Sequence, residues 1–181
     1  MAKSGRYNWG SKALHWAIAA LLLTQFLLIL ARHFLRNANA HEALLELQLL
    51  TIHKSIGLTI LALAPVRLLW RWIGGLPEWP PTLAEWEPRA FHAVETMLYV
   101  LLFLVPIAGA ASTLASGQAL LWFGREVLPA QMNPTPGLSA LALLVHALLI
   151  YTLVGTFALH IGLALRRTFF EGDAYHRRMY F

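Results

Sequence analysis

Four histidines within long apolar segments are the residues whose type and spacing best suit chemistry. His146 and His160 lie fourteen residues apart in one apolar run. At about 100° and about 1.5 Å per residue, both imidazoles leave one face of a helix, roughly 21 Å apart along its axis. Two side chains that far apart cannot share one small ligand, so each needs a partner from another segment. His15 and His53 lie in such segments, and neutral imidazole is a common ligand of transition metals.

The elements that must position these histidines are segments long enough to cross a bilayer. Hydrophobic residues make up 58% of the 181 residues and charged residues 13%, whereas a soluble domain has about 25% charged residues. Asn39 and Glu42 match an N-cap followed by a capping-box acid, so the second helix should begin near residue 40. We predict an all-α transmembrane four-helix bundle that forms one domain over residues 1–181, with helices over about 13–32, 40–73, 92–115 and 138–167. The LLWFG stretch, residues 120–124, is predicted to be an interfacial turn.

The distribution of Lys and Arg predicts the orientation. Ten of these residues lie at the termini and around the connection between the second and third helices, and four lie on the other side. By the positive-inside rule, we predict a multi-pass membrane protein with both termini in the cytoplasm. The basic residues flank apolar runs and form no continuous face, so the expected partner is membrane lipid and not nucleic acid.

This orientation sorts the histidines by depth into an inner pair, His15 with His160, and an outer pair, His53 with His146. Two axial imidazoles on facing helices are what a six-coordinate b-type haem needs. The chain has no cysteine, which excludes thioether-attached haem and thiolate-bound metals. Zinc or copper held by two histidines per layer is an alternative, but no carboxylate lies within either layer to complete such a site. We therefore predict two non-covalent haems b, with these histidines as the iron ligands.

Further residues suit a haem site. Gly57, one turn after His53, removes a side chain that would block a flat macrocycle. The second ring nitrogen of each ligand needs an acceptor, which we expect to be a backbone carbonyl one turn earlier. Arg67 either pairs with propionates of the inner haem or is a snorkelling topology charge. Other candidate propionate partners at the inner face are Lys12, Arg71 and Arg166.

Two pairs of residues are candidates for substrate binding. Lys54 and Arg125 could attract a small anion at the outer face, pair with outer propionates, or be ordinary loop charges. His92 and Trp16 could line a quinone pocket at the inner face. His92 could instead hydrogen-bond a propionate, and an ordinary position at a helix end is equally open.

On these residues the chain resembles the bacterial cytochrome b561 family, which comprises small four-helix dihaem membrane cytochromes. The resemblance covers nearly the whole chain, and only the longer segment before His53 departs from it. The matching stretches are LHW (14–16), IHKSIG (52–57), VRLLWR (66–71), LYVLLFLVPIAG (98–109), WFG (122–124), the His146/His160 pair and the tail FFEGDAYHRRMYF (169–181).

The resemblance implies a protein of the bacterial inner membrane, haem b in two layers, and electron transfer across the bilayer with quinone as one partner. Some bacterial members resemble superoxide oxidases, which pass an electron from periplasmic superoxide to ubiquinone. Our first hypothesis is such an oxidoreductase, which needs no protein partner. The alternatives are a membrane-anchor subunit that relays electrons for a larger dehydrogenase or hydrogenase, and a haem-free helical membrane protein.

Overall fold

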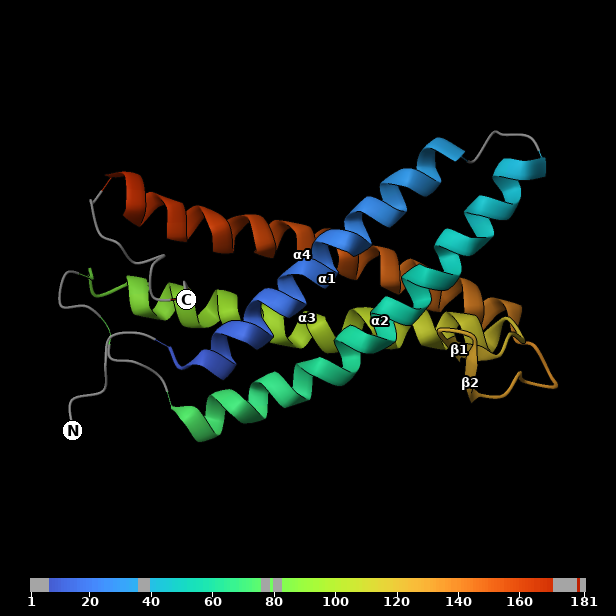
Figure 1. The fold of residues 1–181 in the computed structure, drawn as a ribbon, viewed down its shortest axis with the longest axis horizontal. Coiled ribbons are helices and arrows are strands. Elements are labelled where there is room, and N and C mark those ends of the chain that lie inside the picture. Colours follow the sequence, from blue (N-terminus) through green and yellow to red (C-terminus); the bar gives the residue numbers. More distant parts are fainter. Residues whose placement is uncertain (1–6, 36–39, 76–78, 80–82, 171–178, 180–181) are drawn as a thin grey trace.

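The chain folds into four long helices, as described in a computed structural model for residues 7–35, 40–75, 79, 83–170 and 179 (Figure 1). The helices are α1 (Trp9–Leu35), α2 (Ala40–Gly74), α3 (Glu87–Ala115) and α4 (Pro136–Phe170). Each is long and apolar enough to cross a membrane, which confirms the predicted transmembrane four-helix architecture. We call the end where α1 begins and α4 ends the terminal end, and the opposite end, which carries two short strands, the hairpin end (Figure 1).

Two helices begin earlier than predicted, and side-chain hydrogen bonds hold the chain at both starts. Asn8 caps α1, because its Oδ1 accepts a hydrogen bond of 2.8 Å from the backbone N–H of Ser11. At α3, Glu87 Oε2 accepts a bond of 2.8 Å from the backbone N–H of Ala84, and a proline follows in the first turn. α2 begins at Ala40, near the predicted residue, while the predicted N-cap Asn39 lies outside the described residues.

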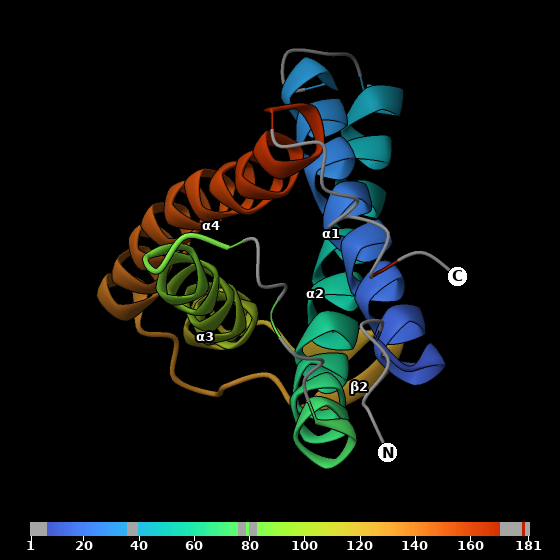
Figure 2. The same cartoon turned by 90° about the vertical axis from the view of Figure 1, so that its left-hand side faces the viewer.

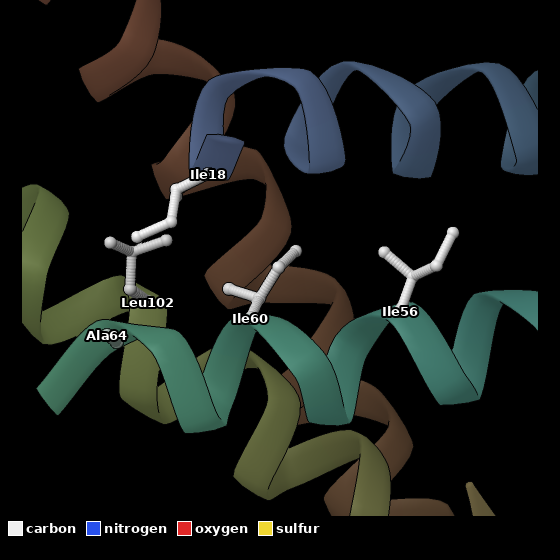
Figure 3. Close-up of a cluster of buried hydrophobic side chains, with 5 residues drawn as sticks. All are labelled: Ile18, Ile56, Ile60, Ala64 and Leu102. Atoms are coloured by element: carbon white, nitrogen blue, oxygen red, sulfur yellow. The ribbon is translucent and has the colours of Figure 1, made fainter. Parts of the chain in front are cut away.

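The helices pack as two neighbouring pairs, α1 with α2 and α3 with α4, and α2 also contacts α3 (Figure 2). Where α1, α2 and α3 meet, a small apolar core is formed by Ile18, Ile56, Ile60, Ala64 and Leu102 (Figure 3). The three residues from α2 are four positions apart, so they share one face of that helix. In the apolar stretch of each helix, only 11–22% of the residues are buried inside the protein. The remaining apolar surface therefore needs lipid as its solvent.

A two-stranded antiparallel hairpin occupies the segment predicted to be an interfacial turn. Its strands are β1 (Leu120–Trp122) and β2 (Arg125–Leu128). Between them, Phe123 has φ 47° and Gly124 has φ 84°, and a type I′ turn requires such a pair of left-handed residues. The expectation of a simple turn was therefore incomplete, because this turn geometry matches the twist of two paired strands.

A buried ion pair joins α3 and α4 at the terminal end. Glu87 Oε2 accepts a hydrogen bond of 2.8 Å from Arg167 Nη1, and the two side chains are 2% and 1% exposed. Glu87 Oε1 accepts a second bond, of 3.1 Å, from Arg166 Nη1. The anion lies at the N-terminus of α3 and the cations at the C-terminus of α4, where the helix dipoles favour them. Because Arg167 follows His160 by two helical turns, this pair fixes the rotation of α4 near that histidine.

Replacing Glu87 with alanine should lower the free energy of unfolding by about 3–5 kcal/mol, because Arg167 stays buried after losing this counter-charge. Denaturant unfolding of the detergent-solubilised protein measures the change. Glu85→Ala is the matched control, since the Glu85 side chain is exposed nearby. Equal stabilities of the two variants would contradict the prediction.

Candidate functional site

The structure brings the four histidines of the apolar segments together in two pairs. The ring centroids of His15 in α1 and His160 in α4 are 6.3 Å apart, with an interplanar angle of 55°. Those of His53 in α2 and His146 in α4 are also 6.3 Å apart, with an angle of 85°. Helix α4 thus contributes one imidazole to each pair, and the partners are those that pairing by depth predicts.

A centroid spacing of 6.3 Å suits two imidazoles bound to opposite sides of one metal ion. If each nitrogen binds at about 2.0 Å and each ring centre lies about 1.2 Å behind its nitrogen, the centres are about 6.4 Å apart. Within the described part of the chain, no group of three or more His, Cys, Asp or Glu side chains could hold a metal ion. A bare zinc or copper ion would therefore have too few protein ligands, whereas a porphyrin supplies four further nitrogens. The residues of each pair fit haem b.

His146 is held in one tautomer by the neighbouring helix. Its Nδ1 lies 2.7 Å from the backbone oxygen of Val105 in α3. Because a carbonyl only accepts, Nδ1 carries the hydrogen and Nε2 keeps its lone pair for a metal. The expected acceptor, a carbonyl one turn earlier in the same helix, was the wrong one for this residue. The imidazole instead reaches across to α3.

Gly109 makes this contact possible, and the sequence interpretation missed it. A Cβ at this position would lie 3.0 Å from Cε1 and 3.2 Å from Nδ1 of His146. The glycine therefore lets the ring lie against α3 and reach the Val105 carbonyl one turn earlier. The signal was present in the sequence as the glycine of the PIAG stretch. Only the packing of α3 on α4 shows which histidine it serves.

Gly57 in α2 faces Gln25 in α1, whose amide bonds to the backbone carbonyl of His53. A Cβ there would have Gln25 Nε2 as its neighbour, at 3.4 Å, and that nitrogen donates a hydrogen bond of 3.0 Å to the His53 carbonyl. Gly57 was predicted to clear space for a macrocycle. Among the described protein atoms, a Cβ at this position would meet only Gln25 Nε2, at an ordinary contact distance.

A cavity of about 240 Å³ surrounds the His15/His160 pair at the terminal end. Its lining includes Trp16, Arg67 and Tyr99. Arg67 Nε donates a hydrogen bond of 3.1 Å to the Tyr99 hydroxyl, and its guanidinium lies 5.7 Å from the centre of the same ring. No carboxylate of the described residues forms an ion pair with Arg67. Its positive charge is therefore available to an anionic group in the cavity.

The other predicted propionate partners are placed differently. Arg71 forms an ion pair with Glu95, while Arg166 binds Glu87 and lies over the ring of Trp86. Lys12 is buried, at 7% exposure, in the first turns of α1. None of these three cations lines the cavity. Of the four predicted candidates, Arg67 is therefore the one that lines this cavity.

The two quinone candidates lie in different surroundings. Trp16 lines the cavity, and its Nε1 donates a hydrogen bond of 2.9 Å to the backbone oxygen of Met179. His92 is exposed and does not line the cavity. Its ring packs edge-on against Trp79, with the centroids 5.2 Å apart, and Trp79 itself is part of the lining. His92 thus lies behind the cavity wall.

The hairpin covers α2 next to the His53/His146 pair. The backbone N–H of Phe123 donates to Ser55 Oγ at 2.9 Å, and Trp122 Nε1 donates to Thr59 Oγ1 at 3.0 Å. Lys54, adjacent to His53, donates from Nζ to Gln118 Oε1 at 3.0 Å. Arg125 opens β2 and is exposed. Lys54 and Arg125, the two cations predicted to attract an anion, therefore both lie at the hairpin end, as His53 does.

Comparison with known proteins identifies relatives of the whole chain. A family model described as prokaryotic cytochrome b561 matches residues 6–181. The chain is also similar to cytochrome b561 homolog 2 of Escherichia coli (strain K12), with 29% identity over 176 residues, which cover 96% of this chain and 90% of that protein. The family resemblance seen in the sequence motifs is thereby confirmed.

Proposed function

This chain belongs to the prokaryotic cytochrome b561 family, and we propose that it is a dihaem oxidoreductase that passes electrons across the membrane from a small anionic donor to quinone. Family members bind b-type haem and transfer electrons across membranes. The observation that carries the proposal for this chain is the presence of two histidine pairs, each with ring centroids 6.3 Å apart.

Each pair would hold one haem b, which supplies a one-electron carrier when bound. His15 and His160 would hold the haem at the terminal end, and His53 and His146 would hold the haem at the hairpin end. The protein's other contribution is orientation. The Val105 carbonyl fixes the His146 tautomer, and a carbonyl that accepts the Nδ1–H strengthens imidazole as a donor to iron.

Arg67 is the proposed partner of a haem propionate at the terminal end. It lines the cavity with His15 and His160, and Tyr99 holds its guanidinium by a hydrogen bond and by the face of its ring. A guanidinium held in this way loses little side-chain freedom when it binds a carboxylate. The alternative of a snorkelling topology charge is less favoured, because the group lies inside a cavity of the bundle.

Superoxide is the proposed donor and ubiquinone the proposed acceptor. Two superoxide anions would release two electrons and leave two molecules of O₂. One quinone would then take up these two electrons and two protons to become quinol. Lys54 and Arg125 give the hairpin end positive charge, which raises the encounter rate of an anion. Trp16 in the cavity wall is the candidate contact for quinone, while the position of His92 behind Trp79 makes it the weaker candidate.

The proposed orientation places the terminal end in the cytoplasm of a bacterium and the hairpin end in the periplasm. The excess of Lys and Arg at the termini and around the α2–α3 connection supports it. In this orientation the half-buried Lys54 and the exposed Arg125 would both lie on the periplasmic side.

Superoxide should reduce the purified haem-loaded protein and form quinol when ubiquinone is present. We expect Lys54→Gln and Arg125→Gln each to lower the second-order rate of haem reduction by up to about tenfold, with a weaker dependence on ionic strength. Stopped-flow absorbance measures this rate. Arg89→Gln is the control, because Arg89 is an exposed cation in α3 at the opposite end.

Two outcomes would count against this function. An absence of both haem reduction and quinol formation with superoxide would rule out superoxide as donor. A soluble oxidoreductase subunit that co-purifies stably and reduces the haems would favour the membrane-anchor alternative.

A further inference from the structure

Two buried polar atoms at the hairpin-end histidine pair have no hydrogen-bond partner in the described part of the chain, although another hydrogen bond already joins their two residues. Gln25 in α1 donates a hydrogen bond of 3.0 Å from Nε2 to the backbone carbonyl of His53 in α2. Gln25 Oε1 and His53 Nδ1 are both buried, and neither has a hydrogen-bond partner among the described residues. Each atom is therefore desolvated without compensation.

The chemistry of the two atoms is complementary. If His53 binds iron through Nε2, its Nδ1 carries the hydrogen and is a donor. Gln25 Oε1 is an acceptor. The amide cannot be reversed, because that would turn its oxygen toward the His53 carbonyl and set two acceptors against each other. The oxygen thus remains available to a donor on the same residue.

We propose that Gln25 is a positioning residue for His53, with Gln25 Oε1 accepting the Nδ1–H of the imidazole directly after ring rotation or through one water molecule. The proposal rests on the haem coordination proposed above for His53 and His146. Gly57 lies opposite the Gln25 amide, and a Cβ there would lie at van der Waals distance, 3.4 Å, from Nε2. The two ligands of one haem would then have different acceptors, a side-chain amide for His53 and the Val105 carbonyl for His146.

This arrangement predicts opposite effects of two substitutions of similar size. Gln25→Met removes the acceptor, so the imidazole becomes a weaker donor and the reduced iron is favoured. Gln25→Glu keeps an oxygen acceptor and makes it stronger, which favours the oxidised iron. The midpoint potential of one haem should therefore rise in Gln25→Met and fall in Gln25→Glu, and haem affinity at that site should fall about 10- to 100-fold in Gln25→Met.

The test uses the full-length haem-loaded protein and follows each haem by redox titration and by the low-spin signals of its electron paramagnetic resonance spectrum. The haem at His15 and His160 serves as an internal control for folding. Thr24→Val is the matched control variant, because the exposed Thr24 bonds only within its own helix, to the Ala20 carbonyl at 2.9 Å. If Gln25 served only to donate its Nε2 hydrogen bond to the His53 carbonyl, both variants would lose that donor. Gln25→Glu would then shift the midpoint potential in the same direction as Gln25→Met.

Two results would overturn the proposal. One is an unchanged potential and spectrum of the His53 haem in Gln25→Met, and the other is a shift in the same direction in both variants. Failure of the proposed function is distinguishable from either result. If His53 did not bind a haem, His53→Ala would leave the haem content unchanged. If His53 bound a haem but Gln25 did not position it, His53→Ala would still lose one haem.

Discussion

Alanine in place of His146 should remove one haem, and alanine in place of His160 should remove the other. Each change would delete one of the two histidines proposed to hold that haem, and the described residues offer no third protein ligand to replace it. The content should fall from two haems per chain to one in each variant, as measured by pyridine haemochrome absorbance against protein concentration. Because the two histidines serve different pairs, the remaining haem should differ in potential and spectrum between the variants.

The partner histidines make the prediction specific. His53→Ala should leave the same haem as His146→Ala, and His15→Ala the same haem as His160→Ala. His33→Ala is the control, since the exposed His33 lies in the last turn of α1. If His146→Ala and His160→Ala lost the same haem, the pairing of the histidines would be wrong. A wild-type protein without a b-type absorption band would support the haem-free alternative.

Leucine in place of Gly109 should abolish haem binding at the His53/His146 pair. A Cβ alone would lie 3.0 Å from the His146 ring, and the three further carbons of leucine would have to occupy the space of the imidazole. The ring would then lose both its contact with α3 and its hydrogen bond to Val105. Gly109→Ala is the milder test, and we expect it to weaken haem affinity by about 10- to 100-fold, as the loss of an outer-shell partner does.

Gly155→Leu is the matched control for the glycine change. Gly155 is exposed on α4, and a Cβ there would meet no described protein atom within 4 Å. Both substitutions replace helical glycine by a better helix former, so a loss confined to Gly109→Leu reports the contact with His146. Haem titration into the haem-depleted protein measures the affinity. Equal haem affinity in both variants would show that Gly109 does not position the ligand.

The sequence by itself determined the architecture and the pairing of the histidines. Four apolar runs of membrane length can form only helices in lipid, where every backbone group must be satisfied internally. Alternating passes then assign each histidine a depth, and a rise of about 1.5 Å per residue separates His146 from His160 by most of a membrane's thickness. Local periodicity and depth were therefore enough to predict that His15 meets His160 and that His53 meets His146.

Only the tertiary structure decided which groups surround the histidines. That Val105 accepts from His146, that Gly109 admits its ring and that Gln25 touches His53 all depend on the rotation and closeness of neighbouring helices. The helical period does not determine the rotation and separation of neighbouring helices, because both follow from how side chains interlock at each interface. The same reason applies to the cations. Arg71 and Arg166 form ion pairs with Glu95 and Glu87, whereas Arg67 faces the cavity. The spacing of these arginines along the sequence does not predict this difference.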